Sequence, residues 1–495
     1  MAPSIEGLEQ RVVERLGSVV DEQALANPHA ARRLLLAAFK AKRLQTRYLP
    51  ERRQPAWGRL VSRIALEDMV GPLDHPQRSV LTSIFMPTEL FRAAGLLPYA
   101  AEAVAGFFSA ACAEQAFITE AEGSGIAETY CSFHKTLIGA ERLGVIEAPE
   151  LVASCSLACD ANSLTFKRLA GDWGVARSFI DVPYEVSEDS VSYVAEQFRD
   201  LAALLESLGH PVDRTRLTEL CASGQRSLSS LAAGLPLRRG RFLRTTMGQE
   251  MQAALALHLS LGRPGVERMC TALLEELRGG AGSEGTGNAT RAGSETPGAG
   301  PRAAGVGSSG RAGNRTAGHA GADSSLGGLN LVWMHIPPFF QEPLQEMLDN
   351  TPGCQIVASD MCYDVVGGMA REDALESDAG ESEPVLAEPA AGDPFAFMAR
   401  RLVYNAFNGP AERRIARVLN LAHATGADGV VCFCQWGCKH TLGLSQMAKA
   451  RLEAQGFPTL VLEGDGCNHA NTSNGQVATR MGAFLEMLRS RRQTA

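Results

Sequence analysis

The chain has 495 residues, of which 45% are hydrophobic and 21% charged, and its formal net charge is −8. This length exceeds what one hydrophobic core supports, so we expect two or three domains of an ordinary globular protein. The negative balance excludes a general nucleic-acid binder, because phosphate contact needs a basic face. The N-terminus lacks the apolar core of a signal peptide, and the most apolar long window, 93–117, contains Glu102 and Glu114, which disfavour a membrane span. We therefore expect a cytoplasmic protein.

The first part of the chain predicts helices followed by an α/β domain. Residues 1–75 are polar, with a leucine stripe beside a basic face, and are expected to form an N-terminal helical segment. From Ser79 the β-branched run SVLTSIFM predicts a strand, and PTELFRAAG opens a helix at Pro87. We assign residues 76–278 to this first domain. Its further expected elements are a helical stretch through Phe117, a strand before Cys155 and Cys159, a strand at Phe179–Val182, and helices from Val191 to about Leu277.

Residues 279–328 differ in composition, with 16 glycines and no aromatic residue. Such a segment cannot bury apolar surface, and we expect a disordered linker. It contains two GxGxxG strings, starting at Gly280 and Gly305, but neither follows a strand or opens a helix. A dinucleotide site is therefore not predicted, and no GxxxxGK[ST] string indicates a P-loop.

Residues 329–495 predict a second α/β domain. LNLVWMHI is a strand, QEPLQEMLDN a helix and CQIVASDM a strand, and an acidic loop follows at 372–393. A buried strand at Gly429–Gln435, a turn at Cys438, an amphipathic helix and a second strand at Pro458–Glu463 form a βαβ unit, which implies a parallel sheet. A terminal helix is expected at Gly475–Arg491. Both halves repeat the order strand, cysteine turn, helix.

Three of the twelve cysteines stand at turns or helix starts: Cys131, Cys159 and Cys438. The last two follow predicted strands, where ligands of parallel sheets gather, and a helix N-terminus favours the metal-binding thiolate. Three thiolates from separate loops can hold a 4Fe–4S cluster and leave one iron open. A closed zinc site usually shows a CxxC pair, which the chain lacks.

Two more cysteines are candidate metal ligands. Cys434 lies near the end of its strand, and Cys467 also follows a strand end; Cys432 is expected to pack in the core. We assign structural roles to the cysteines on apparent helices or strand edges: Cys112, Cys221, Cys270, Cys354 and Cys362.

His134 and Lys135 are candidate catalytic residues beside Cys131. Near a cluster they can donate hydrogen bonds to an acyl carbonyl or shuttle a proton, although a surface pair needs no such explanation. Asp160 and Asn162 are expected to cap the helix after Cys159.

Five segments together resemble the 2-hydroxyacyl-CoA dehydratase D-component family, which includes benzoyl-CoA reductase subunits. They are CSFHKTLIGA, SLACDANSLTFKRLA, FIDVPYEVSEDSVSYVAEQ, QWGCKHTLGLSQMAKARLEAQGFPTLVLEGDGC and NGQVATRMGAFLEML. The resemblance implies an α/β fold with two Rossmann-like, doubly wound domains that face each other across an iron–sulfur cluster held by Cys131, Cys159 and Cys438. It also implies a lyase that dehydrates a 2-hydroxyacyl-CoA to an enoyl-CoA through a ketyl radical. An ATP-hydrolysing iron–sulfur activator would supply the low-potential electron.

Some features depart from that family pattern and leave more than one interpretation open. Only one chain is given, so the partner is either a second copy or a homologous subunit. The high cysteine count resembles a branch with a double-cubane 8Fe cluster that reduces small molecules with the same activator; Cys155, Cys434 and Cys467 would then join the ligands. A non-catalytic electron carrier and a zinc-bound structural relic also stay open as interpretations.

Overall fold

The computed structural model describes residues 5–49, 54–243, 246–279, 328–338, 342–349, 353–365, 392–471 and 474–494. The predicted linker, apart from its first and last residues, and most of the predicted acidic loop lie outside these ranges. Among the described residues, no helix combines the length and the apolar character that a membrane crossing requires.

The elements follow one another in the expected alternation. The first half comprises α1 (Ile5–Ala26), α2 (Pro28–Tyr48), α3 (Ala56–Asp74), β1 (Ser79–Thr82), α4 (Glu89–Ala93), β2 (Leu97–Ala100), α5 (Ala101–Ala110), α6 (Gln115–Gly123), α7 (Ser132–Arg142), β3 (Leu151–Cys155), α8 (Asp160–Trp173), β4 (Ala176–Ile180), α9 (Glu188–Ser207), α10 (Arg214–Gly234), α11 (Met247–Leu259) and α12 (Pro264–Gly279). The second half comprises β5 (Leu329–Met334), α13 (Glu342–Leu348), β6 (Cys354–Ser359), α14 (Pro394–Val403), α15 (Ala411–Thr425), β7 (Gly429–Gln435), α16 (Lys439–Leu442), α17 (Ser445–Ala454), β8 (Thr459–Gly464) and α18 (Asn474–Thr494).

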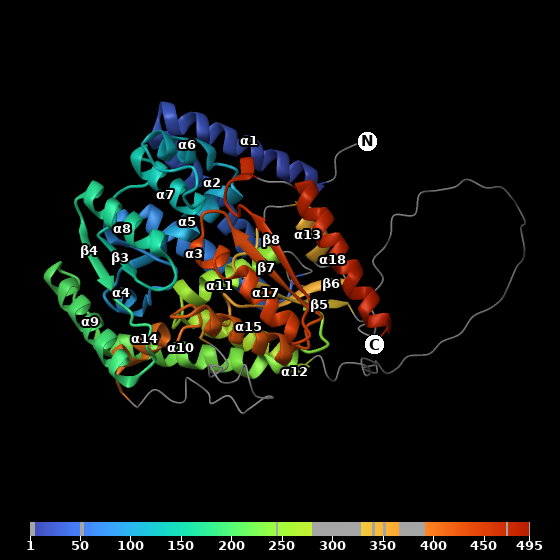
Figure 1. Ribbon diagram of the computed structural model, residues 1–495. Coiled ribbons are helices and arrows are strands. Elements are labelled where there is room, and N and C mark those ends of the chain that lie inside the picture. The colour runs from blue at the N-terminus through green and yellow to red at the C-terminus, as the bar shows by residue number, and fades with distance from the viewer. Residues whose placement is uncertain are drawn as a thin grey trace, which may run out of the picture.

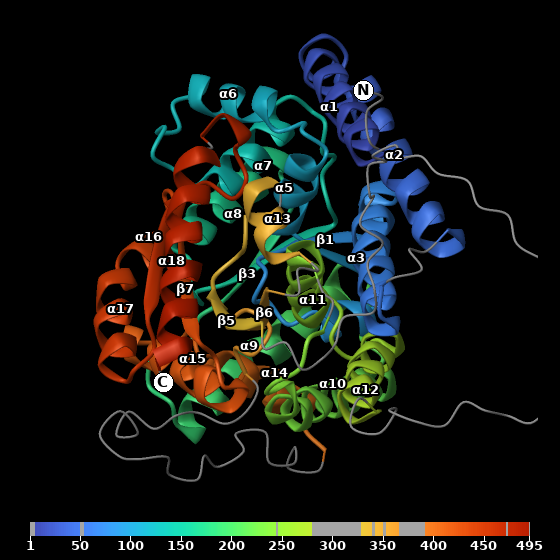
Figure 2. The same ribbon diagram turned by 90° about the vertical axis from the view of Figure 1, so that its right-hand side faces the viewer.

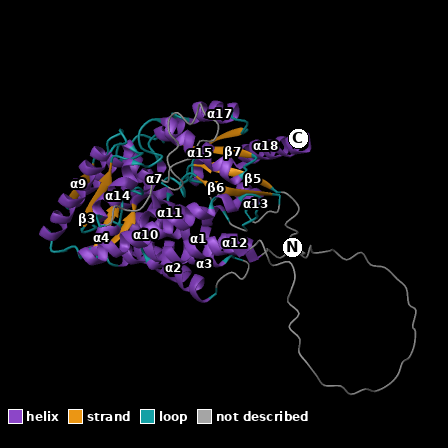
Figure 3. Cartoon of the chain, turned by 90° about the horizontal axis from the view of Figure 1, so that it is seen from below, coloured by secondary structure: helices purple, strands orange, loops and turns teal. Residues whose placement is uncertain are grey.

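The strands of the described residues form two four-stranded parallel sheets, which lie apart with helices between and around them (Figure 3). The first has the order β2-β1-β3-β4 and the second β6-β5-β7-β8. In each sheet the chain runs outward from the centre first to one side and then to the other, as in a doubly wound fold. The predicted α/β class with parallel sheets and an N-terminal helical segment is confirmed.

Two strands of the first sheet differ from the sequence prediction. β2 lies in a stretch that we expected to be helical, and β4 begins at Ala176 rather than Phe179. β2 has four residues and contains Pro98, which cannot donate a ladder hydrogen bond. Its edge position, paired with β1 alone, accommodates that proline.

Helices cover both faces of the second sheet, so most residues of its strands are apolar. α13 and α18 pack on one face, and α15 and α17 on the other (Figure 2). Successive residues of β7 alternate between these faces: Val431 and Phe433 belong to the core beneath α18, whereas Val430 belongs to the larger core. A strand buried on both sides needs apolar residues at every position, which is why β7 was recognisable from the sequence.

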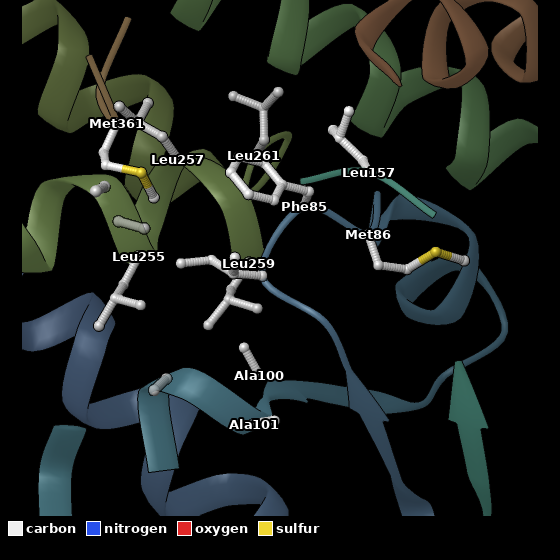
Figure 4. Packing of buried hydrophobic residues seen from close by; sticks show 14 of the residues in the cluster. Phe85, Met86, Ala100, Ala101, Leu157, Leu255, Leu257, Leu259, Leu261 and Met361 are labelled. Carbon is white, nitrogen blue, oxygen red and sulfur yellow. The ribbon is translucent and has the colours of Figure 1, made fainter. Parts of the chain in front are cut away.

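The two sheet-containing lobes contact each other through apolar packing and a buried ion pair. Figure 4 shows Phe85, which follows β1, between Leu261 and Leu259 of the α11 region, with Met361 of the second lobe beside Leu257 of α11. Arg401 of α14 forms an ion pair with Glu89 of α4, and both side chains are buried. The N-terminal helices complete the first lobe, as α3 packs against α2, α11 and α12 (Figure 1).

Candidate functional site

The three cysteines singled out by the sequence share one structural position, because each is the N-cap residue of a helix. Cys131 precedes α7, Cys159 precedes α8 and Cys438 precedes α16. None of the three side chains makes a capping hydrogen bond. Each sulfur therefore lies at the positive end of a helix or helical turn, free of the role that an N-cap side chain usually has.

The turn that carries Cys438 packs directly on the backbone before α7. A Cβ atom added to Gly437 would lie 2.7 Å from the backbone nitrogen of Cys131 and 2.7 Å from the carbonyl oxygen of Thr129. Gly437 has φ +78°, a left-handed conformation that suits glycine. The second lobe thus brings Cys438 against Cys131, across 306 intervening residues of sequence.

Polar contacts lock the same junction. The Ser132 hydroxyl donates to Asp465 Oδ1 at 2.5 Å, and the Gln435 amide donates to Asp465 Oδ1 at 3.0 Å and to Ser132 Oγ at 3.2 Å. Gln435 ends β7 and Asp465 follows β8, so loops of the second sheet hold the first turn of α7. All three side chains are buried, and this network fixes Cys131 relative to the second lobe.

Cys159 joins the other two through α7 and α8. Its sulfur lies 3.7 Å from His134 Nε2, and the hydroxyl of Tyr130 donates to the carbonyl oxygen of Ala161 at 3.1 Å. At the surface, Lys439 Nζ lies 3.9 Å from Asp160 Oδ2, joining the residues that follow Cys438 and Cys159. The sulfurs come from the ends of β3 and β7, which hold equivalent positions in the two sheets, and from the loop before α7.

The pKa shifts of Cys131 and Cys159 indicate that the three sulfurs are close enough to influence one another. Burial, then Cys438, then Cys159 raise the pKa of Cys131 well above its usual range. Burial and then Cys438 raise the pKa of Cys159 to about 12. Three thiolates so placed would repel one another unless a cation lay among them.

The spacing of these thiols differs from that of a mononuclear zinc site. Within the described residues, no three His, Cys, Asp or Glu side chains are close enough to bind one metal ion together. A cuboidal cluster makes a different demand, because each cysteine binds a separate iron at a separate corner. Binding of such a cluster by Cys131, Cys159 and Cys438 stays a prediction.

Comparison with protein families matches residues 83–488 to 2-hydroxyglutaryl-CoA dehydratase, D-component. The match includes all three cysteine turns and every strand of the two sheets except β1. The chain belongs to this family. No curated protein matched in a separate comparison. Membership makes the chain a component of the 2-hydroxyacyl-CoA dehydratase type, and hence a lyase-type enzyme subunit.

The additional cysteine candidates of this dehydratase component are buried and have other contacts. Cys434 Sγ lies 4.0 Å from Cys432 Sγ and 3.9 Å from the Thr441 carbonyl oxygen, and Cys434 is fully buried. Cys467 is also fully buried, and its thiol donates to the Ala105 carbonyl oxygen at 3.7 Å. Their role as ligands stays a prediction. Cys155 likewise lies in the core, 3.7 Å from Ser83 Oγ.

The two residues predicted to be catalytic lie on α7 but have different surroundings. His134 is buried beside Cys159, burial lowers the pKa of His134 to about 4, and its Nδ1 has no hydrogen-bond partner. Lys135 is equally buried, and its ammonium donates to Glu122 Oε1 at 2.6 Å and to the Glu128 carbonyl oxygen at 2.8 Å. Lys135 therefore braces the loop that leads to Cys131. The catalytic role of each residue stays a prediction.

Sequence reasoning missed two buried polar residues near Cys159. Glu102, in the first turn of α5, has a buried Oε2 without a hydrogen-bond partner, and both polar atoms of the Asn162 side chain are also buried and unpartnered. Asn162 therefore does not cap α8, and Asp160 is exposed without a capping bond, so the predicted capping was wrong. The sequence signal that could have indicated a buried Glu102 was a carboxylate within the apolar window 93–117. From the sequence alone, that carboxylate argues only against a membrane span.

The charge state of Glu102 is set by its burial. Burial raises the pKa of the Glu102 carboxyl to about 7, and the dipoles of nearby polar groups oppose the rise only in part. The same carboxylate contributes to the raised pKa of Cys159. Glu102 can therefore gain or lose a proton near neutral pH beside the cysteine site.

The second lobe places a buried cation behind the Cys438 turn. Arg414 of α15 donates through Nε to Asp360 Oδ2 at 2.8 Å, and its Nη1 lies 2.9 Å from His440 Nδ1. Burial and then Arg414 lower the pKa of His440 to about 3. The guanidinium also lies over the Phe407 ring, 4.2 Å from its centroid. Arg414 is thus held as a fixed positive charge near the site.

We expect Glu102→Gln to change how the stability of the metal-free protein depends on pH. The folded-state pKa is raised, so the stability contributed by protonated Glu102 is full below about pH 4.5 and is lost as pH rises through about 7. The loss amounts to something on the order of 3 kcal/mol. Denaturant unfolding between pH 5 and 9 should show that the free energy of unfolding of Glu102→Gln, relative to that of the original protein, increases as pH rises. A constant difference between the two proteins would contradict this assignment.

Proposed function

We propose that this D-component binds a 4Fe–4S cluster through Cys131, Cys159 and Cys438 and dehydrates a 2-hydroxyacyl-CoA to an enoyl-CoA. The single observation that carries the proposal is the convergence of three uncapped N-cap cysteines from two lobes. Thiolates are the ligands of iron–sulfur clusters, and three of them leave one iron for another ligand. The donor set and its burial fit such a cluster.

Polar atoms without hydrogen-bond partners are available to bind a substrate at the iron that has no cysteine ligand. The Nδ1 atom of His134, Oε2 of Glu102 and the Asn162 amide are buried without hydrogen-bond partners. Buried polar groups without partners are costly, so a ligand that satisfies them gains affinity. A 2-hydroxyacyl thioester offers a carbonyl oxygen, a hydroxyl group and an acidic C–H, which suit these donors and acceptors.

When bound, the cluster would supply low-potential electron transfer to the thioester carbonyl. Side chains of the protein would donate and accept the protons of the reaction. Glu102 Oε2 is placed to exchange a proton with the substrate, since its pKa of about 7 permits both charge states at neutral pH. His134 stays neutral and can donate one hydrogen bond without adding charge.

The proposed partners are an ATP-hydrolysing iron–sulfur activator and a second subunit, either a copy or a homologue. Exposed apolar side chains support a docking surface beside the cysteine turns: Trp436 is 43% exposed, Leu442 42% and Leu164 66%. Two of them flank Cys438 in sequence, and the third lies in α8 behind Cys159. Large apolar side chains gathered at a site that must receive electrons are typical of a protein contact.

The double-cubane reductase and the electron carrier remain second candidates. A larger cluster needs more thiolates, and the contacts of Cys155, Cys434 and Cys467 within the cores weigh against it. A carrier would need no proton-handling group, so the unpartnered Glu102 and Asn162 favour an enzyme.

Anaerobic purification followed by iron, sulfide and activity measurements tests the proposal. We expect about four irons per chain and loss of water from 2-hydroxyglutaryl-CoA when activator, ATP and a reductant are added. About eight irons would favour the double-cubane alternative. An intact cluster without water loss from this or other 2-hydroxyacyl-CoA substrates would leave the carrier interpretation, and zinc in a colourless protein would overturn the proposal.

A further inference from the structure

A cysteine, a histidine and a carboxylate contact one another where the end of α5 meets the loop between β8 and α18. Cys112 follows α5, and its Sγ lies 3.9 Å from His469 Nε2. The other ring nitrogen of His469, Nδ1, lies 2.9 Å from Glu114 Oε1. His469 belongs to the loop between β8 and α18, so the two lobes together build this cluster.

The carboxylate orients the imidazole. Glu114 Oε1 accepts a hydrogen bond from the His469 backbone N–H at 3.1 Å as well as from the ring, and Gln115 Nε2 donates to it at 2.8 Å. Glu114 is only 1% exposed, and its Oε2 has no hydrogen-bond partner. A buried carboxylate at Nδ1 keeps a proton on Nδ1, which leaves Nε2 to take a proton from the thiol that it faces.

The backbone holds the thiol in one place. Cys112 has φ +53°, which is uncommon for a residue with a side chain, and its N–H donates to the Ser109 carbonyl oxygen at 2.8 Å. Helix α1 closes over this turn, since a Cβ atom on Gly17 would lie 2.0 Å from the Cys112 carbonyl oxygen. The thiol and the imidazole therefore keep their relative positions without a ligand.

Unlike most cysteines of the described chain, Cys112 is only partly buried, as are Cys159 and Cys438. The His469 side chain is 32% exposed, so a reagent can reach the pair from solvent. Packing alone, the role that sequence reasoning gave it, does not account for an oriented base beside a reachable thiol.

We propose that Cys112, His469 and Glu114 form a second reactive site, in which Cys112 is a nucleophilic thiol that takes soft carbon electrophiles. His469 Nε2 receives the thiol proton, and the sulfur forms a bond to the electrophilic carbon. With an α-halo amide the carbon–halogen bond breaks, and the halide leaves with its electron pair. The products are a thioether at Cys112, a halide ion and protonated His469, which returns its proton to solvent. No oxidant or reductant is required.

The test is the alkylation rate of Cys112 in the full chain, purified anaerobically with its metal content intact. A limiting amount of iodoacetamide is added at pH 7, and labelled peptides are quantified by mass spectrometry over time. We expect Cys112 to react at least about tenfold faster than the same residue in the urea-unfolded chain. His469→Gln should remove this advantage, and Glu114→Gln should reduce it.

His423→Gln is the matched control, because that imidazole packs against Phe457 in another part of the molecule. It should leave the Cys112 rate unchanged. Circular dichroism and iron content of each variant establish that the fold is kept. If one of the two variants at His469 and Glu114 fails to fold, the other still decides the question. A rate equal to that of the unfolded chain, or an unchanged rate in folded His469→Gln, overturns the proposal.

Discussion

Replacing Cys438 by alanine is expected to lower the iron content of this protein from about four irons per chain to about none. Its sulfur is one of three that share the site, and a cuboidal cluster with two protein ligands exposes half of its corners. Cys438 is also only partly buried, so solvent reaches the vacated corner. Dehydration of the acyl-CoA should be lost together with the iron. Metal analysis and visible absorbance of anaerobically purified protein measure the effect directly.

Cys434→Ala provides the matched control from the same strand and turn. This thiol lies four residues before Cys438 but is buried against Cys432, so its removal should leave the iron content unchanged. A loss of about half the iron in Cys434→Ala would indicate a double-cubane cluster instead. Full iron content in Cys438→Ala would show that the proposed ligand set is wrong.

The parts of this fold that the sequence predicts are those with a local cause. β7 was expected at Gly429–Gln435 and is found there, because a strand buried on both faces has an uninterrupted apolar run between turn residues. The helix starts at Cys131, Cys159 and Cys438 were visible because each follows a break in apolar periodicity. That these sulfurs belong to one site was expected because two of them follow strands of parallel sheets, where ligands gather.

The remaining features depend on contacts between distant segments. β2 exists because β1 offers its edge, and nothing within Leu97–Ala100 distinguishes it from a loop. Glu102 acquires its raised pKa only by burial beside Asn162, 60 residues further along the chain. Cys112 and His469 are separated by 357 residues and meet because the loop after β8 returns to the end of α5. Spacing rules cannot find such pairs, since neither partner carries a local signature.

Gly437→Ala should have the second largest effect, because the two lobes touch at this residue, beside the proposed cluster ligands Cys131 and Cys438. An alanine at φ +78° costs about 1–2 kcal/mol of backbone strain. The added methyl group would also lie 2.7 Å from the backbone nitrogen of Cys131, and backbone cannot rotate aside as a side chain can. Relieving that overlap costs a further 1–3 kcal/mol or so and moves Cys438 away from Cys131. We expect a lower melting temperature and loss of most of the iron.

Gly456→Ala separates backbone strain from steric overlap. Gly456 has φ +87°, but a Cβ atom there would have no neighbour within 4 Å. This variant should therefore suffer only the strain, about 1–2 kcal/mol, and keep its full iron content. Equal iron loss in both variants would mean that general destabilisation, rather than the contact between Gly437 and Cys131, empties the site. Unchanged iron in Gly437→Ala would show that the approach of the two lobes at this turn does not position Cys438 for the cluster.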